Sequence, residues 1–195
     1  MAENALNFWE HHHRVQLAAQ ALRAGAVVGY PTEAVWGLGC DPFCLSAVAR
    51  ILAMKRRDAS MGLILIAASV SQLEPFLKGL TESQRLQLAA SWPGPNTWLI
   101  PDNGTAPGWI TGGRSTLAVR VTDHPLAAAL CKAFGGPLVS TSANPHGLPP
   151  AKSALKLKSY FRGSVDDLLP GQVGSAAKPT RIRDLITGDT IRPGA

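Results

Sequence analysis

The sequence predicts an α/β fold, a twisted mixed parallel and antiparallel sheet flanked by helices. Segments with the period of helices alternate with short apolar runs that are typical of strands. Of the 195 residues, 46% are hydrophobic and 16% are charged, as in chains that fold around a core. The expected strands are unevenly separated, which allows antiparallel beside parallel pairing. The length is close to that of one domain, so we expect residues 1–195 to form a single domain.

The first half of the chain begins with a helix and a strand. Residues 14–24 carry apolar side chains at helical spacing, and Gly25 is a typical helix end. The apolar run at residues 26–30, closed by Pro31, predicts a buried strand that ends at a turn. The next two expected elements are a helix at residues 45–54 and a strand at residues 63–66.

The same alternation continues in the second half. The expected elements are a helix at residues 83–90, strands at residues 97–100 and 117–121, a helix at residues 125–134 and a strand at residues 137–139. After Ser140 the chain is polar and rich in Gly, Pro and Lys, and its periodicity is weaker. The sequence leaves open whether this last part forms a lid or a flank.

Charge and cysteine content narrow the functional classes. The chain has 19 Lys and Arg against 13 Asp and Glu, a net charge of +6, which favours phosphate-bearing ligands or polyanions but also fits a merely solvated basic surface. Three cysteines without a secretory signal indicate a reducing compartment. No apolar run reaches the ~20 residues of a membrane span. We therefore expect a cytoplasmic protein without membrane contact.

Three segments carry groups suited to chemistry, and two of them directly follow expected strands. Residues 30–39 hold a hydroxyl, a carboxylate and two glycines, residues 55–57 are Lys-Arg-Arg, and residues 140–144 carry four hydrogen-bonding side chains. Each has an ordinary alternative: the glycines can serve a turn, and the basic triplet can complement a helix end. Together the segments suit a ligand with phosphates and a carboxylate, because ligands bind beyond strand ends in α/β sheets.

Several classes of site are disfavoured. No GxxxxGK[ST] loop is present, so phosphate binding must be built from separated segments. No GxSxG elbow surrounds a serine, and His124 belongs to no recognisable triad, which disfavours covalent catalysis. Cys40 and Cys44 have no second cysteine pair or suitably spaced histidine, which disfavours a structural zinc site.

The same segments, in the same order, resemble the YrdC/TsaC family. The similarity is carried by residues 30–39, 55–57, 92–97, 117–121 and 140–144, and by the closing runs 182–184 and 191–194. It extends from about Val27 to the end of the chain and is closest to the short, single-domain bacterial members. The resemblance implies a twisted α/β sheet around a large, positively charged cavity.

The resemblance also implies an activity. Such an enzyme joins L-threonine, bicarbonate and ATP, with Mg²⁺, into threonylcarbamoyl-adenylate and releases pyrophosphate. A downstream threonylcarbamoyl-transfer complex then modifies tRNA, and binding of tRNA or structured RNA is compatible with the basic charge. The chemistry brings two anions together, so arginines and lysines that offset their repulsion are expected.

Site residues follow from the resemblance position by position. Lys55, Arg57, Ser142 and Asn144 match the lysine-x-arginine and serine-x-asparagine pairs that face the ATP phosphates and the reacting carboxyl groups. The residues that match substrate-binding positions are Thr32, Arg120, Ser140 and Thr180, and those near the nucleotide are Thr116 and Arg192. The resemblance assigns no protein metal ligand.

Two departures and one detail qualify this assignment. Residues 180–184 read Thr-Arg-Ile-Arg-Asp where the family commonly has Ser-Thr-Ile-Val-Asp, and Trp36 stands where many members have tyrosine or phenylalanine. Arg120 is a candidate for a bidentate clamp on the threonine carboxylate. Glu33 and Asp41 can lie near the metal or have surface or turn roles.

Two other functions compete with this one. The first is a carbamoyl-adenylate activity like that of hydrogenase-maturation proteins, which are much longer chains. The second is a non-catalytic RNA-binding or ribosome-maturation factor, in which tryptophans stack on bases. Trp92 and Trp98 flank a Pro-Gly-Pro turn, however, and this favours packing roles for them.

Overall fold

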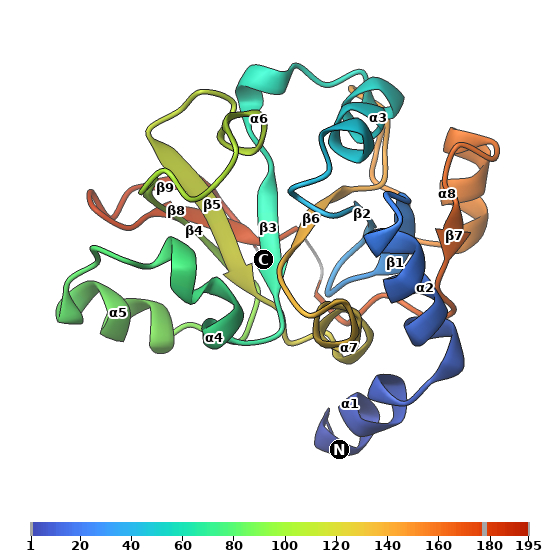
Figure 1. Cartoon of the computed structure of the whole chain (residues 1–195), viewed down its shortest axis with the longest axis horizontal. Helices are drawn as coiled ribbons and strands as arrows, with labels where there is room; N and C mark the ends of the chain where they lie inside the picture. The colour runs from blue at the N-terminus through green and yellow to red at the C-terminus, as the bar shows by residue number, and fades with distance from the viewer. Residues whose placement is uncertain (1, 177–178, 195) are drawn as a thin grey trace.

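A computed structural model describes residues 2–176 and 179–194 and contains a nine-stranded mixed sheet (Figure 1). The helices are α1 (Ala2–Glu10), α2 (His13–Arg23), α3 (Leu45–Lys55), α4 (Val70–Leu73), α5 (Glu82–Ala89), α6 (Gly108–Thr111), α7 (Pro125–Phe134) and α8 (Ala154–Phe161), with 3-10 turns at Ala59–Met61 and Glu74–Phe76. The strands are β1 (Val28–Pro31), β2 (Trp36–Gly39), β3 (Ile64–Ala67), β4 (Asn96–Pro101), β5 (Thr116–Val121), β6 (Leu138–Ser142), β7 (Asp167–Leu168), β8 (Arg181–Asp184) and β9 (Thr190–Arg192).

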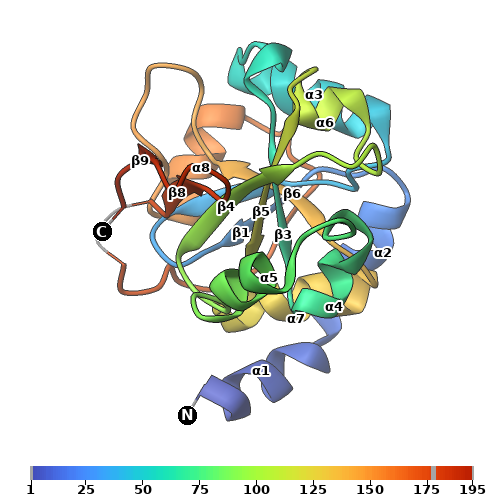
Figure 2. The same ribbon diagram turned by 90° about the vertical axis from the view of Figure 1, so that its left-hand side faces the viewer.

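The strand order across the sheet is β7-β1-β2-β6-β3-β5-β4-β8-β9. The pairs β1/β7, β3/β5 and β4/β8 are parallel, and the other neighbours are antiparallel. Figures 1 and 2 show α4, α5 and α7 on one side of the molecule and α3 and α6 on the opposite side. The predicted mixed sheet flanked by helices is therefore confirmed.

Local sequence accounts for the helix that was predicted most closely. Helix α7 begins with Pro125 in its first turn, where a missing amide hydrogen costs nothing, and the His124 side chain accepts a hydrogen bond from Ala127 N. It ends at Gly135, whose φ of 92° lies in the left-handed region that glycine adopts readily. Its apolar residues face α2 and strands β1 and β3.

Strand β2 corrects one sequence-based interpretation. Gly37 and Gly39 do not serve a turn but lie inside this buried strand. A Cβ atom on Gly39 would lie 2.6 Å from Val139 O and 2.8 Å from the Tyr30 ring, so only glycine allows the strand to pack this closely.

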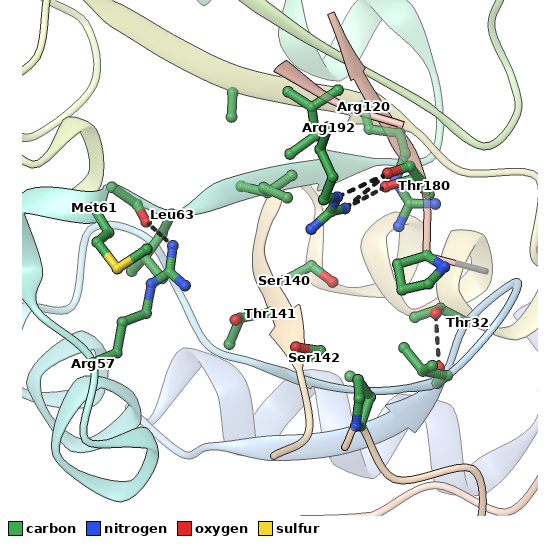
Figure 3. Close-up of a pocket in the computed structure, with 18 of the residues that line it drawn as sticks. Thr32, Arg57, Met61, Leu63, Arg120, Ser140, Thr141, Ser142, Thr180 and Arg192 are labelled. Carbon is green, nitrogen blue, oxygen red and sulfur yellow. Dashed lines mark hydrogen bonds between the residues drawn. The ribbon is translucent and has the colours of Figure 1, made fainter. Parts of the chain in front are cut away.

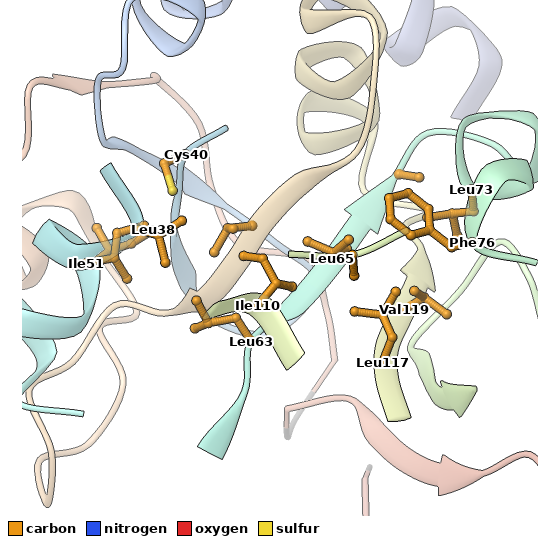
Figure 4. Close-up of a cluster of buried hydrophobic side chains, with 14 of the residues drawn as sticks. Leu38, Cys40, Ile51, Leu63, Leu65, Leu73, Phe76, Ile110, Leu117 and Val119 are labelled. Carbon is orange, nitrogen blue, oxygen red and sulfur yellow. The ribbon is translucent and has the colours of Figure 1, made fainter. Parts of the chain in front are cut away.

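The side chains of β5 point alternately into the hydrophobic core and toward the opposite face of the sheet. Leu117, Val119 and Val121 point into the larger hydrophobic cluster, which also holds Leu65 and Ile51 (Figure 4). Because side chains of a strand alternate between its two faces, Thr116, Ala118 and Arg120 point to the other face. That face is the one that is hollowed.

The segment after Ser140 supplies both edges of the sheet. Ser140 itself continues β6, which is longer than the predicted strand. Strand β7 pairs with β1 at one edge, and β8 and β9 extend the other edge beside β4. Within the described residues, no helix is both long and apolar enough to cross a membrane.

Candidate active site

A cavity of about 280 Å³ opens on the hollowed face of the sheet. Its walls come from the turn between β1 and β2, the loop before β3, helix α6, strands β5 and β6, and the C-terminal strands β8 and β9. Figure 3 shows Arg57 and Thr180 on opposite sides of this space, with Ser140, Thr141 and Ser142 between them. Segments that are far apart in the chain thus converge on one recess.

Four arginines and one glutamate give the cavity wall a positive formal charge. They are Arg57, Arg114, Arg120, Arg192 and Glu33. Hydroxyl groups make up most of the remaining polar wall, from Thr32, Thr111, Thr116, Ser140, Thr141, Ser142 and Thr180. Guanidinium and hydroxyl groups are donors that suit phosphate and carboxylate oxygens.

Arg120 is a buried cation that is compensated by a buried carboxylate. Its Nη1 lies 2.5 Å from Glu33 Oε2, and the side chains of Arg120 and Glu33 are 6% and 9% exposed. Thr122, which directly follows the end of β5, donates a 2.5 Å hydrogen bond to Glu33 Oε1. Burial would raise the pKa of Glu33, but the charge and hydrogen bond of Arg120 and the Thr122 hydroxyl together lower it, so Glu33 is ionised at neutral pH.

This pairing changes what Arg120 can offer a ligand. Its Nε and Nη1 atoms are enclosed and Nη1 faces Glu33, so these two nitrogens are not open to a bound carboxylate. A bidentate clamp through either of them requires the ion pair to rearrange, and the clamp stays a prediction.

The other three cavity arginines bond to neutral carbonyls. Arg57 Nη2 donates to Gly62 O at 3.0 Å, Arg114 Nε donates to Ser60 O at 2.8 Å, and Arg192 donates to Thr180 O at 2.8 and 3.1 Å. Burial and the charge of Arg114 lower the pKa of Arg57, and burial together with Arg120 and Arg57 lowers the pKa of Arg192. Their mutual repulsion makes this part of the cavity receptive to an anion.

Lys55 lies behind the cavity wall. It is the last residue of α3, and Arg56, which follows it in a left-handed conformation with φ 51°, directs Lys55 and Arg57 to different places. Lys55 Nζ donates to Ser142 O, to Asn144 O at 2.8 Å and to Asn144 Oδ1 at 3.4 Å. Burial and the charge of Arg57 lower the pKa of Lys55 to about 8.

Asn144 belongs to the same hydrogen-bond network. Its Oδ1 accepts a 2.6 Å bond from Ser142 Oγ, and its Nδ2 donates to Leu148 O at 2.7 Å. Lys55 and Asn144 therefore hold the end of β6 in place, and Ser142 is the member of this network that reaches the cavity.

The structure brings together eight of the ten site residues proposed from sequence. Those that line the cavity are Thr32, Arg57, Thr116, Arg120, Ser140, Ser142, Thr180 and Arg192. Lys55 and Asn144 are not among the lining residues, although both contact Ser142. Trp92 and Trp98 are buried, in agreement with packing roles.

Sequence reasoning did not select Glu33, Arg114 or Thr141 as site residues. A place near the metal and surface or turn roles were open for Glu33, but it is buried and ion-paired. A lone acid among basic cavity residues was the sign that could have identified it. Arg114 lies in a glycine-rich turn with no motif of its own. Within the described residues, no group of three or more His, Cys, Asp or Glu side chains could hold a metal ion.

Comparisons with known proteins point to one family. The Sua5/YciO/YrdC family model, described as "Telomere recombination", matches residues 20–194. A threonylcarbamoyl-AMP synthase of Cellvibrio japonicus is 54% identical over 185 residues, which are 95% of this chain and 98% of that protein. Another, of Chromohalobacter salexigens, is 57% identical over 179 residues, which are 92% of this chain and 96% of that protein.

A solved structure of similar fold is Sua5 of P. abyssi complexed with L-threonine. It is 34% identical and has a TM-score of 0.86. The match covers 92% of this chain and 54% of that one, so Sua5 is considerably longer.

Proposed function

Since the chain belongs to the Sua5/YciO/YrdC family, we propose that it is a threonylcarbamoyl-AMP synthase, a nucleotidyltransferase that serves tRNA modification. The observation that carries the proposal is the single cavity in which arginines and hydroxyls from distant segments meet. Threonine and ATP are its substrates. ATP and tRNA occur together in the cytoplasm, which is where we place the reaction.

The reaction we propose has two steps, and bicarbonate is the carbon source. The threonine amine attacks the bicarbonate carbon, water leaves and a carbamate forms. A carbamate oxygen then attacks the α-phosphorus of ATP, and pyrophosphate leaves with its electron pair. No side chain has to become covalently attached, so the work of the protein is to hold two anions together and to stabilise charge on the phosphates.

The arrangement of charges supports a division of roles. Arg57 and Arg192, which bond only to carbonyls and hydroxyls among the described residues, are suited to the triphosphate. Arg120, with Thr32 and Ser140 beside it in the wall, is suited to threonine. Lys55 and Asn144 act on Ser142 by holding the end of β6.

Mg²⁺ enters this scheme as part of the MgATP substrate. Among the described residues, Glu33 is the one carboxylate of the wall; it is engaged by Arg120 and Thr122 and is a poor ligand for a cation. Oxygens of the phosphates and water would therefore complete the coordination of the ion. We further propose that the product passes to a threonylcarbamoyl-transfer complex.

Purified protein incubated with ATP, bicarbonate and labelled L-threonine tests the function. We expect pyrophosphate and a labelled adenylate, with pyrophosphate release that depends on both threonine and bicarbonate. Arg57→Ala should lower kcat/KM for ATP by about 100-fold, as the loss of a group that stabilises transferring charge does. Lys158→Ala, an exposed change on α8, is the matched control and should leave turnover unchanged.

The opposite results are equally clear. If threonine and bicarbonate do not stimulate pyrophosphate release and the protein binds structured RNA tightly, the chain is a binding module. If Arg57→Ala keeps full activity, the triphosphate is bound elsewhere.

A further inference from the structure

We propose that Glu33 is a selectivity residue, whose charge balances Arg120 so that the amino-acid end of the cavity accepts a zwitterion and rejects phosphate groups. The identity of the amino acid rests on the proposed function. The difference between Arg120 and the other cavity arginines rests on the contacts of the side chains themselves.

The cavity arginines fall into two groups according to the oxygens that they face. Arg57, Arg114 and Arg192 bond to carbonyl oxygens, and within the described part of the chain none of them pairs with a carboxylate. Their charges therefore remain available to a polyanion. Arg120 differs, because Glu33 lies against it at 2.5 Å.

Balance matters because the two substrates differ in charge. MgATP carries its excess negative charge on phosphates, whereas an α-amino acid at neutral pH has one positive and one negative group. A guanidinium beside a carboxylate presents the same two charges in a small space, so it complements the zwitterion and offers little net attraction to phosphate.

Hydrogen bonds to both its side chain and its backbone hold Glu33 in position beside Arg120. Thr122 Oγ1 accepts a hydrogen bond from His124 N at 3.2 Å, so its single proton is left to be donated to Glu33. The backbone carbonyl of Glu33 accepts a 3.1 Å bond from Ala176 N. Asp123 is exposed, and burial of its carboxyl and the nearby Glu33 raise its pKa, so this second acid is less readily ionised than an ordinary aspartate.

The enclosed atoms show that Glu33 acts through its charge. Oε2 is shielded from solvent, as are Nε and Nη1 of Arg120. Oε2 is therefore closed to a ligand in the cavity, and we assign Glu33 a charge-balancing role that it exerts through Arg120.

The proposal is tested by a substitution that removes the charge of Glu33 and keeps the shape of its side chain. Glu33→Gln leaves Arg120 uncompensated, so inorganic pyrophosphate, titrated calorimetrically in the absence of other substrates, should bind about tenfold more tightly than to the wild type. Pyrophosphate should also become a competitive inhibitor with respect to threonine, with the threonine KM raised about tenfold.

Thr122 supplies the matched controls. Thr122→Val removes the hydrogen bond but keeps the charge of Glu33, so pyrophosphate affinity should stay within about twofold while the threonine KM rises a fewfold. Thr122→Ser keeps the hydroxyl and should resemble the wild type. If Thr122→Val gains as much pyrophosphate affinity as Glu33→Gln, geometry accounts for the effect and the proposal fails.

A double variant covers the case in which Glu33→Gln does not fold. Glu33→Gln with Arg120→Gln is neutral and retains hydrogen-bonding groups, and it should bind pyrophosphate within about threefold of the wild type. A loss greater than tenfold would make Arg120 a direct phosphate ligand and overturn the inference. Pyrophosphate titration needs no turnover, whereas failure of the proposed function would appear as absent wild-type turnover.

Discussion

Two cations, Lys55 and Arg120, are nearly equally buried, at 4% and 5% exposed, yet the protein stabilises them by different means. Lys55 is surrounded by the oxygen dipoles of Ser142 and Asn144 at the end of β6. Arg120, near the end of β5, is compensated by the full charge of Glu33. Dipoles thus hold Lys55 in a structural role, whereas the counter-charge beside Arg120 sets the electrostatic character of a binding surface.

The largest effect is expected where a formal charge loses its partner. Arg120→Met leaves the Glu33 carboxylate buried and uncompensated, so we expect the free energy of unfolding to fall by about 3–5 kcal/mol in urea titrations. Arg120→Met combined with Glu33→Gln should recover more than half of that loss, because no buried charge remains. Equal stability of the single and double variants would contradict the ion pair.

A smaller loss is expected where a cation leaves only dipoles behind. Lys55→Met removes the ammonium from three oxygen acceptors, and we expect a destabilisation of about 2–3 kcal/mol. The matched control Lys158→Met, exposed on α8, should change stability by less than about 0.5 kcal/mol. If Lys55→Met is harmless to stability, the clamp on the end of β6 is not needed for folding.

Lys55 should also make the stability of the protein depend on pH. Because the pKa of Lys55 is lowered to about 8 in the folded protein, the unfolded chain binds the proton more tightly between pH 8 and the ordinary lysine value. The cost of its charge is present in full below pH 8 and is relieved as the pH rises. Wild-type stability relative to Lys55→Met should therefore increase by about 2–3 kcal/mol from pH 7 to pH 10, as denaturant titrations can measure. A flat difference would show that Lys55 titrates normally.

The smallest effect is expected for an ion pair outside the cavity. Arg50 and Asp166 pair at 2.9 Å with side chains 43% and 39% exposed, so solvent screens their attraction. Arg50→Gln should cost less than about 1 kcal/mol in thermal or urea unfolding. A loss as large as that of Arg120→Met would show that exposure does not explain the difference between the two pairs.

The sequence predicted α2, α3, α5, α7 and the central strands because their patterns are local, but it did not predict α1, α4, α6 or α8. Helix α7 has its proline, its apolar face and its terminal glycine within one short segment. Strands β8 and β9 were not predicted, since they are short and polar and are defined by backbone pairing with β4 and with each other. Strand β2 was missed because its glycines suggest a turn.

Most residues of the candidate site were predicted from the sequence, but the contacts between them were not. Motif similarity selected residues that largely line one cavity, yet nothing in the sequence indicates the left-handed conformation of Arg56 that turns Lys55 away from Arg57. The pairing of Glu33 with Arg120 depends on the curvature of the sheet, because β2, β6 and β3 lie between β1 and β5. Such contacts follow from tertiary structure alone.

The strand order has a consequence for folding kinetics. Val28 lies opposite Asp167 and Gly37 opposite Ser142, so neighbours in the sheet come from remote parts of the polypeptide. Closing such long loops costs conformational entropy before the contacts that offset it have formed. Proteins with high contact order therefore fold slowly, in milliseconds to seconds. On the ribosome, the recess that needs both Thr32 and Arg192 can be completed only after nearly the entire polypeptide has emerged.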